Sequence, residues 1–318
     1  MKRYSGWLIQ SVLAGVLLVL LYWRWQVSQA RFFDVDEFSY LHWTAELVKG
    51  QRPYVDFFMF FGPGFLWFFA PLVKIYWMNA SLFIAARVVA FGIFLAMLGG
   101  LGILFGKTRG WKWAIVPVII LSFLPMPYDK LLEVRPDNLA VLIGLIGFLS
   151  QIEWLQKNKK HWAFLSGVFY SASLLVFIKN LPFVAVGVVI ALLTKGDRKA
   201  FFLGLATPAL LFFLWLLTLG DLGMAWYSLT KLPFEANMMG KFDIMEPHLF
   251  FFPNASFYGG WGVTAGLLTN HALWTLGIVM GAIRLFTPYV TAQGDRKKML
   301  VELLIGGTFV VLVYGYVQ

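Results

Sequence analysis

Residues 31–64, RFFDVDEFSYLHWTAELVKGQRPYVDFFMFFGPG, carry the side chains of this sequence that are best suited to chemistry. This stretch holds five carboxylates: Asp34, Asp36, Glu37, Glu46 and Asp56. A carboxylate can act as a general base that takes a proton from a hydroxyl group. Because long apolar segments flank the stretch on both sides, these acids are expected at a membrane face.

The acidic stretch also has a helical pattern. After Asp36 and Glu37, apolar residues recur at helical spacing, namely Phe38, Leu41, Ala45 and Val48. The pattern predicts a short amphipathic helix in the plane of the membrane interface, with its apolar side toward lipid and its carboxylates on the water side. Gly50, Pro53 and the turn at 62–64 would end it and lead the chain back to the bilayer.

Composition places the whole chain in the membrane. Of its 318 residues, 60% are hydrophobic and only 13% are charged, and the mean hydropathy is +0.74, whereas soluble domains average about 25% charged residues. We therefore predict an all-α, polytopic bundle that forms a single transmembrane domain over 1–318, with no separate soluble domain. The absence of cysteine excludes disulfides, thiolate catalysis and cysteine-bound metals.

About nine segments are long and apolar enough to be interpreted as spans. Their expected positions are 7–25, 81–105, 113–124, 137–155, 162–178, 182–193, 201–219, 267–286 and 300–316. Residues 65–77 are expected to be interfacial or re-entrant. A cleaved signal peptide is the alternative for the first segment, because Ser28-Gln29-Ala30 loosely resembles a cleavage site.

The distribution of charge orients this bundle. With the N-terminus in the cytoplasm, the cytoplasmic side holds fifteen basic and four acidic residues, and the other side holds eleven basic and twelve acidic residues. This asymmetry follows the positive-inside rule. The net charge of +10 is thus a topological signal, and nucleic-acid binding is not implied.

Most acids therefore belong to the extracytoplasmic side. They are concentrated in a first loop (26–64), in residues 128–137 and in a late loop (221–264) that contains Glu235, Asp243 and Glu246. Chemistry is expected on this side.

Three motifs carry a resemblance to a known family. The first loop reads Asp36-Glu37-x-x-Tyr40, then Ala45, Gly50, Pro53-Tyr54 and Asp56-Phe57; further on come Glu133-x-Arg135-Pro136-Asp137 and the segment GVFYSASLLVFIK, residues 167–179. In this order they resemble the GT-C glycosyltransferases, and most closely the group of protein O-mannosyltransferases and bacterial aminoarabinose transferases. The resemblance covers roughly residues 1–220.

The resemblance implies an enzyme that transfers a hexose or pentose from a polyprenyl-phosphate donor to an acceptor hydroxyl outside the cytoplasm, usually with inversion. The acceptor could be a glycan, a lipid or a protein. Such an enzyme would lie in a bacterial cytoplasmic (inner) membrane among membrane lipids, and a protein partner is conceivable. No cofactor is required with certainty, although a divalent cation could bind.

The reaction requires a base for the hydroxyl proton and cations for the leaving phosphate. By the resemblance, Asp36 is the base and Glu37 its neighbour in catalysis, while Tyr40, one helical turn on, could bind Asp36 or the sugar. Glu133 and Asp137 could orient the acceptor. The donor phosphate is assigned to Lys179, with Arg135 and Arg87 as further candidates.

Simpler interpretations stay open for each residue. Asp36 could be only a helix N-cap, and Asp34 could be the base instead. Glu133 and Asp137 could be a capping acid and a partner of Arg135. Lys179 could reach lipid headgroups. The sequence also lacks the lysine before a double proline that aminoarabinose transferases carry in this loop, and the four histidines are too widely spread for a metal motif.

Two other classes of function remain as alternatives. A transporter or lipid flippase would place ionisable residues along a path through the membrane. A non-catalytic subunit of a cell-envelope assembly complex could keep the fold without the activity.

Overall fold

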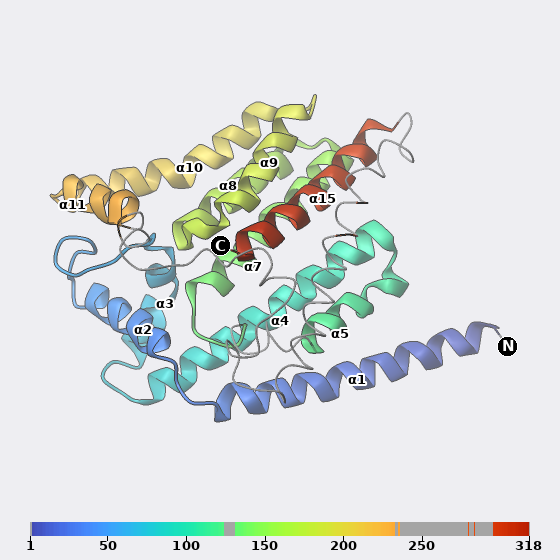
Figure 1. Ribbon diagram of the computed structural model, residues 1–318, viewed down its shortest axis with the longest axis horizontal. Helices are drawn as coiled ribbons and strands as arrows, with labels where there is room; N and C mark the ends of the chain where they lie inside the picture. Colours follow the sequence, from blue (N-terminus) through green and yellow to red (C-terminus); the bar gives the residue numbers. More distant parts are fainter. Residues whose placement is uncertain are drawn as a thin grey trace.

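The computed structural model of the protein describes residues 2–123, 131–232 and 295–317, together with the single positions 235, 279 and 283. Apart from an isolated bridge between Pro53 and Phe57, the regular structure within these ranges is helical. The long helices run side by side across the molecule, and short helices gather at one end (Figure 1). The all-α prediction is therefore confirmed for the described residues.

The N-terminal half begins with α1 (Lys2–Ala30) and two short helices, α2 (Val35–Val48) and α3 (Gly64–Ile75). The chain then crosses the molecule in α4 (Ser81–Arg109) and turns back through η1 (Trp111–Trp113) and α5 (Ile115–Phe123). Lys107 and Arg109 lie in the last turn of α4, where the helix dipole favours positive charge.

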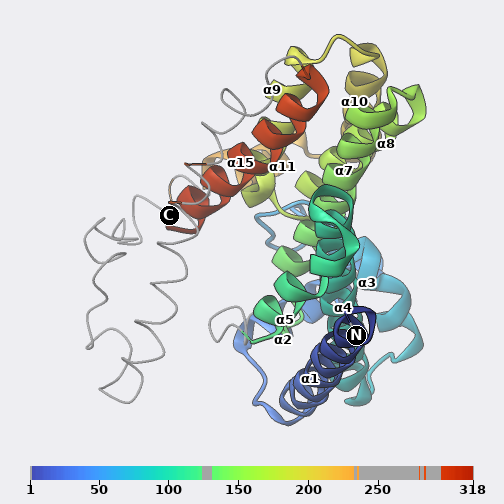
Figure 2. The same ribbon diagram turned by 90° about the vertical axis from the view of Figure 1, so that its right-hand side faces the viewer.

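The C-terminal half is a set of antiparallel neighbours. Its elements are α7 (Pro136–Lys157), α8 (Lys160–Val176), η2 (Ile178–Asn180), α9 (Leu181–Leu193), α10 (Arg198–Leu217), α11 (Leu222–Trp226), the π-helical turn η3 (Tyr227–Lys231) and α15 (Arg296–Val317). Proline at the first position of α7 and a left-handed Asn158 after its end set the bounds of that helix. Helix α15 lies beside α9 and α7 (Figure 2).

Helices α8 and α10 approach each other closely through glycines. A Cβ on Gly167 would lie 2.1 Å from the carbonyl oxygen of Phe201, and one on Gly204 would lie 2.0 Å from that of Phe164. The two contacts are reciprocal, so the backbones touch where the side chains are absent. Such small-residue contacts are a common way for helices to pack in membranes.

Four described helices are long and apolar enough to cross a membrane. They are Leu8–Ala30, Ser81–Arg109, Pro136–Lys157 and Arg198–Leu217, and three shorter apolar helices accompany them. Helices occupy eight of the nine predicted positions, but α5, with nine residues, extends only about 14 Å against a hydrocarbon core of about 30 Å. The count of nine spans is thus not confirmed, and 267–286 lies outside the described residues except Val279 and Ile283.

Helix α2 packs differently from the prediction. On its apolar side Leu41 is buried among neighbouring aromatic residues while Phe38 is 44% exposed, so an interfacial position of the helix is not confirmed. Of its carboxylates, Glu37 and Glu46 are buried while the Asp36 side chain is 42% exposed. The expectation that all three carboxylates face water was therefore wrong for Glu37 and Glu46. Glu37 pairs with Arg87, and Glu46 pairs with Lys49.

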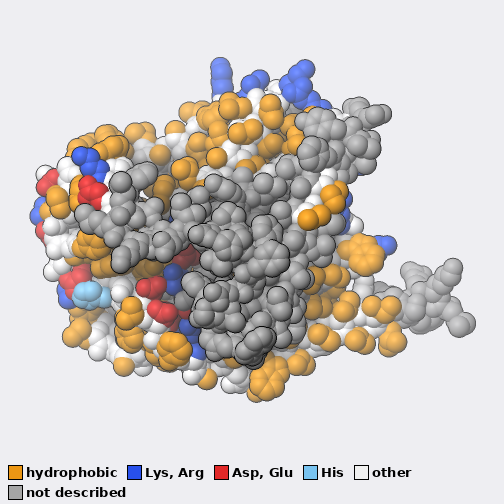
Figure 3. Space-filling model, in the orientation of Figure 1, with side chains coloured by type: hydrophobic (Ala, Val, Ile, Leu, Met, Phe, Trp, Pro, Cys, Tyr) orange, Lys and Arg blue, Asp and Glu red, His pale blue; other side chains and the backbone are white. Residues whose placement is uncertain are grey.

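The basic turns meet at the end of the molecule opposite α2. Lys107 and Lys157 both pair with Glu153, and Arg109 pairs with Glu302 at 3.3 Å. Arg296 donates a hydrogen bond to the carbonyl of Leu193 at 2.6 Å. Figure 3 shows lysine and arginine along the upper edge of this view, and acids, bases and a histidine mixed at its left edge.

Candidate functional site

The charged residues of the first loop and those before α7 converge on Arg135. Its Nη1 lies 2.8 Å from Oδ2 of Asp36 and 3.1 Å from Oε2 of Glu133, and its Nε lies 3.1 Å from Oδ2 of Asp137. Three carboxylates predicted from two separate motifs therefore share one guanidinium. We call Asp36, Glu133, Arg135 and Asp137 the acid cluster.

Asp36 occupies the first turn of α2, and Asp34 precedes it as the N-cap. The Asp34 side chain accepts a hydrogen bond from the Asp36 amide at 3.0 Å, and Glu37 completes a capping box by accepting one from the Asp34 amide at 3.3 Å. This motif satisfies N–H groups at the helix start that lack partners within the helix. The interpretation of Asp36 as the N-cap was therefore wrong, and its carboxylate is free of that structural task.

Glu37 lies behind the cluster in an ion pair with Arg87 of α4. The Nη2–Oε2 distance is 2.8 Å, and neither side chain has exposed surface. Glu37 also accepts a hydrogen bond from the Val134 amide at 3.0 Å. This residue thus joins α2, α4 and the segment that carries Arg135.

Arg87 uses four of its donor positions inside the protein. Besides two hydrogen bonds to Glu37, it donates one to the carbonyl of Arg31 and one to that of Phe32, both at 2.8 Å. Its guanidinium also stacks 3.6 Å over the Phe33 ring. A guanidinium has five N–H groups, so little of Arg87 is left for a phosphate.

Glu133 and Asp137 differ in exposure. Glu133 is buried and also pairs with Arg31 at 2.7 Å, whereas the Asp137 side chain is 36% exposed at the start of α7. The predicted ion pair between Glu133 and Arg135 is thus present, as is the acid in the first turn of α7. Arg31 was not identified from the sequence; its position at the end of the first apolar segment, next to the acids, was the available signal.

Tyr40 stands next to the acid cluster on the same side of α2 as Asp36. Burial raises the pKa of its hydroxyl well above the usual range. The nearby charge of Arg135 lowers this pKa, whereas the carboxylates of Asp36 and Asp137 raise it further. Its ring packs against Phe61 and Phe65 at centroid distances of 5.6 and 5.5 Å. The Tyr40 ring therefore provides an apolar surface next to the acid cluster, and its hydroxyl stays protonated.

Arg135 occupies the middle of the carboxylates, where a metal ion would otherwise be expected. Partial burial works to lower its pKa, but the carboxylates of Asp137 and Glu133 outweigh burial and raise it. Within the described ranges, no group of three histidine or acidic side chains is arranged to hold a metal ion. In this arrangement the positive charge among the acids comes from the protein itself.

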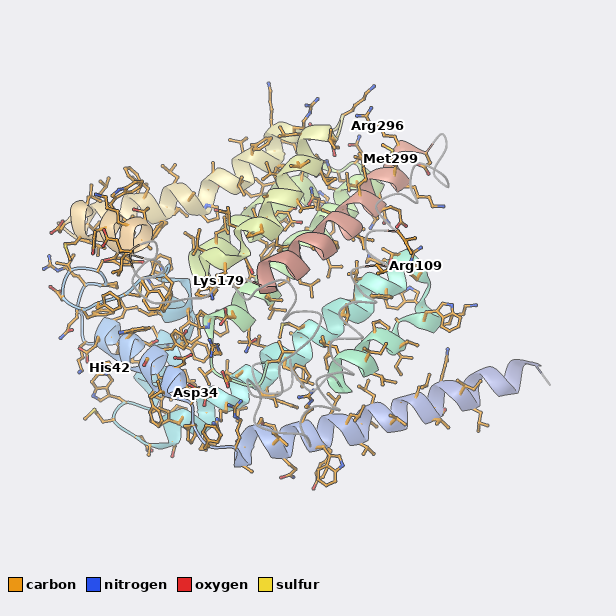
Figure 4. All side chains as sticks on the ribbon, in the orientation of Figure 1. Asp34, His42, Arg109, Lys179, Arg296 and Met299 are labelled. Carbon is orange, nitrogen blue, oxygen red and sulfur yellow. The ribbon has the colours of Figure 1, made fainter. Side chains whose placement is uncertain are left out.

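Lys179 lies on the break between α8 and α9. Figure 4 shows it on the side of Asp34 and His42, away from Arg109 and Arg296. Its side chain is exposed, and Nζ lies 5.4 Å above the Phe177 ring. Phe177 in turn contacts Phe61, at 6.4 Å between ring centroids. Aromatic packing thus connects Lys179 to the surroundings of Tyr40.

A separate groove of about 600 Å³ runs along the other face of α2. Its wall includes Phe38, Ala45, Trp77 and Phe83, with His42 at its rim. The ring of Phe38 packs on that of Phe83 at a centroid distance of 4.6 Å and on that of Phe33 at 5.8 Å. The lining also includes the charged residues Glu46 and Lys49, so apolar and charged side chains share the groove.

Two of the acids predicted in the late loop, Asp243 and Glu246, lie outside the described residues. In comparisons with protein families, with characterised proteins and with solved structures, nothing matches this chain.

Proposed function

We propose that this protein is a membrane glycosyltransferase that moves a sugar from a polyprenyl-phosphate donor to an acceptor hydroxyl on the extracytoplasmic side. The observation that carries the proposal is the position of Asp36. It is a half-exposed carboxylate in the first turn of α2, fixed by Arg135 and free of helix capping.

In the proposed reaction, Asp36 takes the proton of the acceptor hydroxyl. The acceptor oxygen forms a bond to the anomeric carbon while the bond from that carbon to the phosphate oxygen breaks, and the prenyl phosphate leaves. Arg135 binds Oδ2 of Asp36, so Oδ1 is the oxygen offered to the proton. A base held within hydrogen-bond reach of the hydroxyl is the geometric requirement for this step.

The leaving phosphate needs positive charge at the same end of the molecule. Of the three cations predicted for this role, Arg87 is buried in its pair with Glu37, and Arg135 is shared among three carboxylates. Lys179 is exposed. The geometry therefore supports Lys179 as the first candidate for the donor phosphate.

The charge distribution supports the proposed side of the membrane. The basic turns meet at the end opposite the acid cluster, through contacts such as Lys107 with Glu153 and Lys297 with the Gln156 carbonyl. By the positive-inside rule, the basic end would be cytoplasmic. The acid cluster and Lys179 would then face the extracytoplasmic side, in a bacterial cytoplasmic membrane by the resemblance described above.

The test is transfer of radiolabelled sugar from a panel of polyprenyl-phosphate sugars into membrane extracts. We expect Asp36→Asn to lower transfer at least about 100-fold, in keeping with the loss of a general base. Asp56→Asn is the matched control, because Asp56 is also paired with an arginine of the first loop, Arg52 at 2.9 Å, but stands outside the acid cluster. It should keep transfer within about twofold of wild type.

Two results would count against the proposal. Undiminished transfer by Asp36→Asn would remove the assigned base. If folded wild-type protein yields no transfer from any donor, a transporter, a flippase or a non-catalytic assembly subunit becomes the better interpretation, and lipid translocation is then the activity to measure.

A further inference from the structure

We propose that the start of α9 is a phosphate-binding site formed by Lys179, Asn180 and the positive end of the helix dipole, and that it holds the phosphate of the lipid-linked donor. The inference rests on the proposed function and names the place of its leaving group. Asn180 is the new element of this site.

Asn180 carries a polar group that the fold itself does not use. The residue is only 8% exposed, and within the described part of the chain its Nδ2 is buried without a hydrogen-bond partner. Burying an amide without a partner costs free energy. An N–H donor of this kind is explained if an anion accepts its hydrogen bond during function.

The backbone at this position adds positive potential. Asn180 is the N-cap of α9, a helix of 13 residues, and its side chain makes no capping hydrogen bond. Helix N-termini carry partial positive charge that favours anions. At this start the Leu181 N–H donates to the Ile178 carbonyl and Pro182 has no N–H, so the helix contributes its potential rather than hydrogen bonds from these two residues. In membrane proteins, helices that begin within the bundle use this end to bind anionic substrate groups.

Lys179 supplies the full charge at the same place. It is adjacent to Asn180 in the short η2 turn, and its ammonium group is exposed. Two donors of different kinds, an ammonium and an amide, thus flank the start of one helix. Hydrogen bonds from a cation to a phosphate are roughly twice as strong as neutral ones.

The site also contacts α7, the helix that begins at the acid cluster. The Asn180 Nδ2 is 3.4 Å from the point where a Cβ on Gly144 of α7 would stand. Gly144 follows Asp137 by seven residues, which places both on one face of α7 about 10 Å apart. The proposed phosphate site and the acid cluster therefore both contact α7, about two helical turns apart.

The experiment measures binding of radiolabelled farnesyl phosphate, a short prenyl phosphate, to the full-length protein in phosphatidylcholine nanodiscs. We expect Lys179→Gln and Asn180→Asp each to weaken binding about tenfold, because each removes a hydrogen bond to a charged group and the second adds negative charge. Lys74→Gln is the control, since Lys74 is another exposed lysine at this end, on α3. It should bind as wild type does, and farnesol, which lacks phosphate, should not distinguish the variants.

Asn180→Ala serves as a second variant in case Asn180→Asp does not fold, because it removes the donor without adding charge. Wild-type affinity in both Lys179→Gln and Asn180→Ala would overturn the site. If nanodiscs of phosphatidylglycerol abolish binding, a phospholipid headgroup occupies the site and the assignment to the donor falls. Competition by inorganic phosphate alone supports a phosphate site.

The two proposals can fail separately. If sugar transfer depends on Asp36 while substitutions of Asn180 and Lys179 leave farnesyl phosphate binding unchanged, only the proposed phosphate site is wrong. If binding depends on both residues and is unchanged in Asp36→Asn, yet no donor supports transfer, the phosphate site stands and the glycosyltransferase is wrong.

Discussion

Glu37 and Arg87 form a buried ion pair next to the acid cluster. Both side chains are fully buried, and together they bond to the chain at Arg31, Phe32 and Val134. These contacts hold the two segments that carry Asp36 and Arg135 against each other. Glu37 was predicted as a catalytic neighbour of Asp36 and Arg87 as a phosphate ligand. Their buried ion pair instead stabilises the segments that carry the acid cluster.

Arg87→Met is therefore expected to destabilise the protein by about 3–5 kcal/mol, because it leaves the Glu37 carboxylate buried without its cation. The double variant Arg87→Met/Glu37→Gln should recover part of this loss, since no unpaired charge remains. Thermal unfolding of the purified protein in detergent measures both. As a control, Arg52→Met breaks an exposed pair with Asp56 and should cost at most about 1 kcal/mol. Equal unfolding temperatures for wild type and Arg87→Met would contradict this account of the pair.

At the scale of elements, the contact between α8 and α10 depends on two glycines. Gly167 and Gly204 each face a carbonyl of the other helix at a distance that leaves no room for a Cβ. Because the obstacle is backbone, a side-chain rotation cannot relieve it. The packing of α8 against α10 also fixes the direction of the chain into η2 and the start of α9, where Lys179 lies.

We expect Gly167→Val and Gly204→Val to separate these helices and lower the yield of folded protein severalfold, as overpacking costs about 1–3 kcal/mol or more. Size-exclusion chromatography of a fluorescent fusion reports the folded fraction. Gly99→Val is the control, because a Cβ there would meet nothing within 4 Å. If all three variants fold alike, the glycine contact does not determine this packing.

At the scale of the whole molecule, charge separates the two ends. The end with α2 holds the acid cluster, and the opposite end holds the turns with Lys107, Lys157 and Arg296. Figure 4 shows Lys179, the candidate phosphate ligand, nearer to Asp34 than to Arg296. The separation of charge also makes the side of the membrane a direct test of the proposed function.

The sequence contains no cysteine, so single-cysteine variants can be labelled without background. We expect His42→Cys, at an exposed position of α2, to react with a membrane-impermeant maleimide in intact cells. Lys159→Cys, at the exposed turn between α7 and α8, should react only in inverted vesicles or after lysis. Labelling of both from the same side would contradict the topology and, with it, the extracytoplasmic site.

Much of the local structure followed from the sequence. Helical periodicity, Pro136 before Asp137 and the glycine turns predicted the order of the helices, because these features act between residues a few positions apart. The number of spans did not follow, because apolar composition cannot distinguish a short packed helix such as α5 from one that crosses the bilayer.

The sequence by itself also determined that the acids gather outside the long apolar segments, and it proposed Asp36, Glu133, Arg135 and Asp137 as candidates. Only the tertiary structure decided that these four meet at one guanidinium, that Glu37 turns inward to Arg87, and that Asn180 is left with a buried, unused donor. The physical reason is separation along the chain: Asp36 and Arg135 are 99 positions apart, and which partner a buried charge finds depends on how distant helices pack, not on spacing within one segment.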